Sequence, residues 1–315
     1  MQNVTPTADP GIFQLDPHAL KSPQPNIEWR SVATRVYHFV KSWILEFGVR
    51  ILKVALIIKG ALCGTPPEYV TPSGENNNWK EDNKGLVVGV HGLFGRPDIW
   101  RRQLAVLNKE QPHFEVRLPH VPKRGNCSLD EATAPIEAMV RDYIEKHPGK
   151  PVCLMGISRG GPVIHKVEAL LRDTNTPIKV SAVAGVLSGT KIVNLLDNLG
   201  LAGWVLDSHL TDEIRHTSET ATKLMKQMEE STDALRSYRF YATPNDFLIR
   251  PFTGSLPFLA NKDAEYYLIP GESHNSIASR IAAHQINDCA RWINDNQPSS
   301  SHSWRNWIPF MKRAG

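Results

Sequence analysis

From residue 86 onward, short apolar runs alternate with longer amphipathic segments along the chain. The short runs predict strands at Leu86–Val90, Phe114–Leu118, Val152–Gly156, Val180–Leu187, Ser237–Ala242 and Glu265–Ile269. The longer segments predict helices at Leu129–Lys146, Gly160–Leu171 and Ser276–Asp295. This alternation is typical of the α/β class, in which a mostly parallel central sheet has helices on both faces.

The remaining segments differ from this pattern and define the expected organisation. A length of 315 residues fits one large domain with extensions, or two small domains. We expect a disordered leader at 1–28, an amphipathic helical extension at 29–64, a linker at 65–85, the α/β domain at 86–297 and an aromatic and basic tail at 298–315. The leader contains prolines and acidic residues but no continuous apolar run, so a conventional signal peptide is not expected there.

The charge balance and the cysteines restrict the classes of partner. The net charge is only +4, and no basic run interleaved with aromatic residues occurs in the middle of the chain, so nucleic acid is not an expected partner. The four cysteines are far apart and form no CxxC pair. This spacing disfavours a metal site or a disulfide framework and favours a reducing, cytoplasmic location.

Residues 29–64 show a helical pattern whose charged residues fall on one arc, at about 100° per residue. The opposite side is apolar and includes Val36, Val40, Trp43, Ile44 and Phe47. The longest apolar run, Val54–Ile58, is far shorter than the roughly 20 residues that span a bilayer. Two interpretations stay open: a helix packed on its own domain, which we favour, or a helix lying in a membrane interface.

The tail has the same mixed character as the helical extension. Residues 304–313 combine Trp304, Trp307 and Phe310 with basic residues, a composition that suits the lipid headgroup region as well as docking on the domain. Peripheral membrane contact through residues 30–62 and 304–313 is therefore a hypothesis of the sequence.

The most informative motif is Gly156-Ile157-Ser158-Arg159-Gly160, directly after an apolar strand and at the start of a helical pattern. A serine on such a strand-to-helix turn has a strained backbone and projects its hydroxyl into a cleft. Glycines two positions before and after it are needed because side chains there would collide with the neighbouring strand and helix. The context favours a nucleophilic serine, Ser158, over a plain turn of small residues.

An acyl transfer needs two backbone N–H donors aimed at the developing oxyanion. The amide of Arg159, directly after the nucleophile, is the first candidate. The loop His91-Gly92-Leu93-Phe94-Gly95 follows the strand Leu86–Val90, and we expect the amide of Leu93 to be the second donor. His91 is expected to be a structural histidine that bonds the local backbone.

A nucleophilic serine also needs a base, and the base needs a carboxylate that fixes its tautomer. On this type of turn the acid and then the base follow the serine, at the ends of later strands. Asp246 follows the strand Ser237–Ala242, and His274 lies between the strand Glu265–Ile269 and the last helix. Glu272 is the fallback acid, although its place two residues before His274 is awkward.

With these motifs in place, the chain resembles the α/β-hydrolase superfamily. The resemblance is carried by HGLFG (His91–Gly95), GISRGG (Gly156–Gly161), ATPND (Ala242–Asp246) and PGESHNSI (Pro270–Ile277). It covers about residues 85–295 and is closest to the lipase and esterase branch. It implies a triad of Ser158, Asp246 and His274, with Leu93 and Arg159 at the oxyanion. Ile157 and Arg159 stand where His and Gln are often seen, and Ser273 where glycine is common, which weakens the case for a triglyceride lipase.

The resemblance also implies a helical lid insertion at about 192–233, whose first half is apolar. An ordinary packed helical pair is the alternative for this segment. The implied activity is a serine hydrolase that cleaves a carboxylic ester with an apolar acyl group, from a small molecule or a lipid, without a cofactor or metal. A thioesterase or deacylase, and a non-catalytic binding protein on a hydrolase scaffold, remain as alternatives.

Overall fold

The computed structural model describes residues 4–21, 34–48, 69–70, 83–110, 113–229, 235–259, 261 and 263–298. Most of the expected linker, the second half of the helical extension and residues 299–315 of the tail lie outside the described residues. What the sequence predicts for those segments, including the aromatic cluster at 304–313, therefore stays a prediction.

A single mixed sheet forms the centre of the described part of the molecule. Its strands are β1 (Val4–Pro6), β2 (Phe13–Leu15), β3 (Tyr69–Val70), β4 (Gly85–Val90), β5 (Phe114–Leu118), β6 (Val152–Ile157), β7 (Ile178–Val183), β8 (Arg236–Ala242) and β9 (Ala264–Leu268). Their order is β1-β2-β9-β8-β7-β6-β4-β5-β3. The six central strands from β5 to β9 run parallel, and the antiparallel β2 and β3 flank them. All carboxyl ends of the parallel strands therefore lie at one edge of the sheet.

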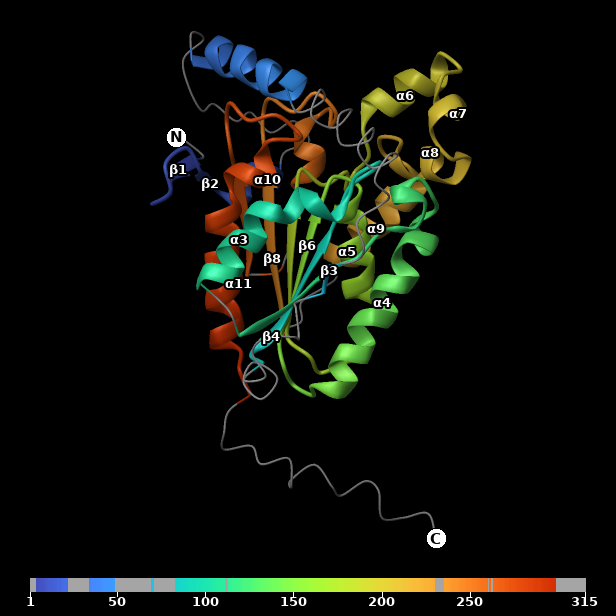
Figure 1. Cartoon of the computed structure of the whole chain (residues 1–315). Coiled ribbons are helices and arrows are strands. Elements are labelled where there is room, and N and C mark those ends of the chain that lie inside the picture. Colours follow the sequence, from blue (N-terminus) through green and yellow to red (C-terminus); the bar gives the residue numbers. More distant parts are fainter. Residues whose placement is uncertain are drawn as a thin grey trace, which may run out of the picture.

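Helices cover both faces of this sheet (Figure 1). They are α3 (Arg101–Glu110), α4 (Leu129–Lys146), α5 (Gly160–Leu170), α6 (Lys191–Asn198), α7 (Ala202–Val205), α8 (Ser208–Ile214), α9 (Glu219–Glu229), α10 (Ile277–Arg280) and α11 (Ala282–Asp295). The helices α4 and α5 pack on one face, and α3 and α11 on the other. Strand side chains alternate between the two cores, so that Val88 faces α4 and α5 while Val87 faces α3 and α11.

The predicted fold class is confirmed, and two elements have the predicted bounds, β5 and α4. The strand expected at 180–187 instead ends at Val183, because Ala184 adopts a φ of 44° that an extended strand does not allow. Helix α3 was not predicted. Its mean hydropathy is low, and only Gln103 and Leu107 of its side chains are buried.

Residues 4–21 correct the expectation of a disordered leader. They form β1, β2 and a short 3-10 helix, Pro17–Lys21. Strand β2 pairs with β9, with Phe13 opposite Leu268, and Ile12 and Leu15 are buried. The composition of this segment did not indicate order, because its few apolar residues are buried only by pairing with β9, which is distant in sequence.

Residues 34–48 form a single helix, called here the N-terminal helix, above the carboxyl edge of the sheet (Figure 1). It packs on its own domain, as favoured, but through its polar side: Ser42 and Glu46 are buried. Its apolar side faces mostly outward, and Phe39 is the member that also contacts Phe247 of the domain. These large side chains are exposed: Val36, Tyr37, Phe39, Val40, Trp43, Ile44 and Phe47. The amphipathic pattern thus predicted the helix correctly, but not which face it buries.

Two further observations concern membranes and cysteines. Within the described ranges, no helix combines the length and the apolar character that crossing a bilayer requires. The structure pairs Cys153 of β6 with Cys289 of α11 as a disulfide, whereas Cys127 is free and buried. The distance of the cysteines in sequence gave no sign of this pairing, since β6 and α11 meet only in the fold.

Candidate active site

Ser158 lies between β6 and α5 with a φ of 56°, the left-handed region that side chains with a Cβ rarely adopt. Its carbonyl accepts the amides of Gly161 and Val186, and its own amide donates to Val183. These backbone bonds hold the strained turn from β7, from the segment after β7 and from the start of α5. The predicted elbow conformation is therefore present.

The glycines around Ser158 make this turn sterically feasible. A Cβ at Gly156 would overlap the carbonyl of Gly160, and a Cβ at Gly160 would overlap the carbonyl oxygen of Val90. Side chains at either position would separate α5 from β4 and β6. The spacing of the motif is thus a packing requirement of the junction between strand and helix.

The loop after β4 approaches the nucleophile closely. A Cβ at Gly92 would lie 2.8 Å from Ser158 Cβ and 3.3 Å from Ser158 Oγ, so only glycine allows this approach. Neither the amide of Leu93 nor that of Arg159 donates a hydrogen bond to any group in the described part of the chain. The two amides proposed for the oxyanion are thus not engaged elsewhere.

His91 has the structural role expected of it. Its Nε2 accepts the amide of Val121 at 3.1 Å, and its Nδ1 lies 2.9 Å from the carbonyl oxygen of Gly92, to which it donates as a neutral ring. Burial lowers the pKa of His91 to about 4. Both ring nitrogens are used, so His91 holds the loop that carries Leu93.

The side chain of Arg159 points away from the nucleophile and into the insertion. It forms a buried ion pair with Glu213 of α8 and donates to the carbonyl of Cys127. Glu213 also accepts the amide of Leu129 at the start of α4. Burial lowers the pKa of Arg159, although Glu213 opposes this effect. Arg159, whose amide is predicted to serve the oxyanion, is therefore anchored to the insertion through its side chain, a contact that the sequence did not indicate.

Asp246 and His274 are brought together as predicted. His274 Nδ1 lies 2.8 Å from Asp246 Oδ2, and both side chains are buried. The second oxygen, Asp246 Oδ1, accepts the amides of Leu248 and Ile249 at 2.7 and 2.8 Å. The carboxylate is thus fixed by the backbone, which lets it orient the imidazole.

The fallback acid, Glu272, is used elsewhere. It binds Lys41 of the N-terminal helix at 3.0 Å and accepts the hydroxyl of Ser276 at 2.7 Å. Its carboxylate therefore supports the loop around His274 from outside, and the geometry favours Asp246 as the acid.

Ser158, Asp246 and His274 follow the carboxyl ends of β6, β8 and β9, at the same edge of the sheet. Among these described residues no hydrogen bond joins the Ser158 hydroxyl to His274. Bonds of this kind are often long before substrate binds. No group of three or more His, Cys, Asp or Glu side chains in the described ranges is arranged to hold a metal ion.

Helices α6 to α9 form the insertion between β7 and β8, and α6, α7 and α8 stand above the carboxyl edge (Figure 1). Leu195, Leu199, Leu201 and Trp204 expose their side chains, and Trp204 is 87% exposed. In contrast, Leu210 and Ile214 are buried in a small core with Val186 and Ile249. The insertion is thus anchored through α8 and presents apolar side chains through α6 and α7.

A scan against models of protein families and a search of curated proteins found no match. The structure, in contrast, is similar to many solved structures. Est1E from Butyrivibrio proteoclasticus with ferulic acid bound has a TM-score of 0.52 and 15% identity, covering 72% of this chain and 95% of that chain.

Two lipases are similar to the same extent. The monoacylglycerol lipase of Paleococcus ferrophilus has a TM-score of 0.51 and 19% identity, covering 74% of this chain and 100% of that chain. A soluble variant of the monoglyceride lipase of Saccharomyces cerevisiae, in complex with a substrate analog, has a TM-score of 0.50 and 17% identity, covering 73% and 92%. The sheet order, the elbow and these similarities together show that the chain has the α/β-hydrolase fold, which it shares with esterases and lipases.

Proposed function

We propose that the protein is a serine hydrolase that cleaves a carboxylic ester with an apolar acyl group. One observation carries the proposal: Ser158 on a strained elbow shares a sheet edge with a buried Asp246–His274 pair. A structural turn would not need a left-handed serine, and a structural histidine would not need a carboxylate fixed by two amides.

The chemistry follows from these positions. Ser158 Oγ attacks the acyl carbonyl while His274 Nε2 takes the hydroxyl proton, and Asp246 stabilises the imidazolium. The carbonyl oxygen becomes an oxyanion, to which the amides of Leu93 and Arg159 donate. The C–O bond to the alcohol then breaks, and His274 returns the proton to the leaving alcohol. Water, deprotonated by His274, hydrolyses the acyl-enzyme and restores Ser158.

Two observations support an apolar acyl group and an ester. The segment of α6 and α7 stands above the carboxyl edge of the sheet and exposes Leu195, Leu199, Leu201 and Trp204, and Ser158 follows the carboxyl end of β6 at that edge. Structures with the same fold include a monoacylglycerol lipase and a protein solved with ferulic acid. A panel of p-nitrophenyl esters of increasing acyl length, with acyl thioesters alongside, distinguishes this proposal from a thioesterase. Faster turnover of the thioesters would contradict it.

Labelling with a fluorophosphonate tests the nucleophile. Wild-type protein should be labelled, and Ser158→Ala should not. Ser208→Ala, which removes an exposed hydroxyl from α8, is the matched control and should be labelled like the wild type. Absence of labelling in folded wild-type protein would contradict the proposal and favour a binding role.

We also propose that the N-terminal helix contacts a lipid surface. Besides Phe39, whose ring packs on Phe247, its outward side carries six exposed large apolar side chains, including Trp43, which is 57% exposed. Amphipathic helices with such a face lie in the membrane interface. Flotation with liposomes should show binding that is lost in a Trp43→Ser, Phe47→Ser double variant. Leu170→Ser, an exposed apolar position on α5, is the control and should bind like the wild type. Unchanged flotation of the double variant would reject this contact.

A further inference from the structure

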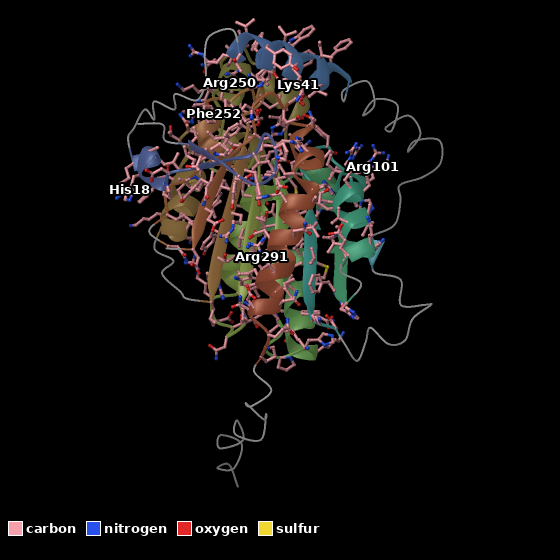
Figure 2. The ribbon with its side chains drawn as sticks, turned by 90° about the vertical axis from the view of Figure 1, so that its left-hand side faces the viewer. His18, Lys41, Arg101, Arg250, Phe252 and Arg291 are labelled. Atoms are coloured by element: carbon pink, nitrogen blue, oxygen red, sulfur yellow. A yellow bond between two sulfur atoms is a disulfide. The ribbon has the colours of Figure 1, made fainter. Side chains whose placement is uncertain are left out.

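The N-terminal helix lies against the loop that carries His274. Asn275, the residue after His274, donates through Nδ2 to Glu46 Oε1 at 2.7 Å. Lys41 binds Glu272 at 3.0 Å, on the other side of His274. Figure 2 shows Lys41 on the helix at the upper end of the molecule, far from Arg291 on α11. The helix therefore holds the loop on both sides of the imidazole.

The same helix reaches the acid of the pair. The ring of Phe39 packs edge-on against Phe247 with their centroids 5.4 Å apart, and Phe247 directly follows Asp246. At Gly271, a Cβ would lie 3.0 Å from the ring of His38, so the helix and the loop are in tight contact. One helix thus touches the neighbours of both Asp246 and His274.

From the inner side, the loop is held by the strand ends and by itself. The amide of Gly271 donates to Asn245 Oδ1, and Thr243 Oγ1 donates to the carbonyl of Glu272. Ser273 and Ser276 bond each other within the loop. From outside the loop, Glu46 accepts a hydrogen bond from the side chain of Asn275.

The position of Glu46 is chemically unusual. Its side chain is only 4% exposed, on the polar side of a helix whose other side is apolar and faces outward. Removing a carboxylate from water is unfavourable unless hydrogen bonds compensate. Asn275, 7% exposed, supplies such a bond. Packing alone would be served better by an apolar residue at position 46.

We infer that Glu46 is a positioning residue for His274, acting through Asn275, and that Lys41 assists it through Glu272. The inference rests on the proposed function, because it assigns these contacts to the base of that reaction. With Glu46 in place, the loop keeps the imidazole turned so that Nε2 can serve Ser158. Without it, the loop samples other orientations, and fewer encounters with substrate are productive.

The test compares Glu46→Ala and Glu46→Gln with the wild type on a water-soluble short-chain p-nitrophenyl ester, without lipid. Glu46→Ala should lower kcat by about tenfold and change KM less than twofold, since the loop positions the base and does not bind the acyl group. Glu46→Gln should stay within about threefold of the wild type, because its amide oxygen still accepts the bond from Asn275. Arg35→Ala, on an exposed part of the same helix, is the control and should leave kcat unchanged.

A double-mutant cycle with Asn275→Ala separates positioning from a general loss of structure. The double variant Glu46→Ala, Asn275→Ala should lose no more kcat than the larger of the two single losses, because the variants remove one shared bond. Additive losses, an unchanged kcat in Glu46→Ala, or a Glu46→Gln variant as slow as Glu46→Ala would each overturn the inference. Should Glu46→Ala fail to fold, Asn275→Ala alone must still show the fall in kcat at constant KM.

Labelling distinguishes the two proposals. If the wild type reacts with a fluorophosphonate and the Glu46→Ala variant retains full kcat, the positioning role of Glu46 is overturned and the serine hydrolase proposal stands. Wild-type protein that neither reacts nor turns over any ester would overturn both.

Discussion

The two halves of the candidate active site are built differently. The nucleophile side is held by backbone: Ser158 exchanges hydrogen bonds with Val183, Gly161 and Val186, and Gly92 lets the neighbouring loop approach it. The base side also has local backbone bonds, from the amides of Leu248 and Ile249 to Asp246, but it depends in addition on side chains from other parts of the sequence. Asp246 binds His274, and Glu46 of the N-terminal helix binds Asn275.

This difference has a physical origin. A strained turn must be stabilised by hydrogen bonds and packing with the residues close to it. Small residues at fixed spacing allow those residues to approach. A loop after a strand is not strained, so its orientation depends on whatever packs against it. We therefore expect the nucleophile side to tolerate distant substitutions and the base side to respond to them.

Asp246→Asn should have the largest effect, on the base side. An asparagine can still accept the amides of Leu248 and Ile249 through its oxygen, but its NH2 group would then face His274 Nδ1 and favour the wrong tautomer. We expect kcat to fall about 10⁴-fold with the fold intact. Steady-state kinetics measure kcat, and a thermal melt checks that the variant is folded. Asp173→Asn, at an exposed carboxylate, is the control. A loss under tenfold would remove Asp246 from the proposed triad.

Gly92→Ala tests the nucleophile side at the point where the loop after β4 comes closest to Ser158. The new Cβ would lie 2.8 Å from Ser158 Cβ, so the loop must move and carry the amide of Leu93 with it. Loss of one oxyanion donor lowers kcat about 10²- to 10³-fold. Gly203→Ala, where a Cβ meets nothing within 4 Å, is the control and should be fully active. Wild-type kcat in Gly92→Ala would show that this loop does not serve the oxyanion.

His91 gives the nucleophile side a pH-dependent stability. Its pKa is lowered by burial from 6.5 to about 4 in the folded protein. Between these values the unfolded chain binds more protons than the folded one, so the free energy of unfolding falls as the pH drops from 6.5 to 4. The contribution of His91 is on the order of 3 kcal/mol.

Urea unfolding at pH 7 and pH 4.5 checks this, with wild type compared with His91→Gln. The variant should lose less stability between the two pH values than the wild type does. His18→Gln, outside the loop, should behave like the wild type. An equal loss in wild type and His91→Gln would contradict the assignment.

Lys41→Met should have the smallest effect. The ion pair with Glu272 is partly exposed on the lysine side, and such pairs contribute about 0 to 1 kcal/mol. We expect kcat to fall less than threefold and the melting temperature to change little. A loss as large as that of Glu46→Ala would mean that Glu272, and not Asn275, is the main contact of the helix with the loop.

The parts that could be predicted from the sequence are those with a local cause. The elbow at Ser158 was predictable because its glycines are required within a few residues, and β5 and α4 because their apolar periodicity matches their burial. The order of Asp246 and His274 after Ser158 was sufficient to pair them.

The parts that were missed depend on contacts distant in sequence. β2 is a strand because β9 offers it an edge, and its own three residues carry little signal. The N-terminal helix buries Glu46 because Asn275 lies opposite it, 229 positions away. Arg159 likewise forms its ion pair with Glu213, 54 positions later in the sequence. The pattern of apolar and polar residues along a single helix or strand does not show which distant residue its side chains will contact.

If the proposed mechanism holds, Ser158 becomes acylated during turnover. A p-nitrophenyl carbamate can trap this state, because carbamoyl-enzymes hydrolyse slowly enough to be digested and analysed by mass spectrometry. We expect one carbamoyl group per chain, on the peptide that contains Ser158, and loss of esterase activity in proportion to its formation. A carbamoyl group on any other peptide, or none while ester turnover proceeds, would contradict it.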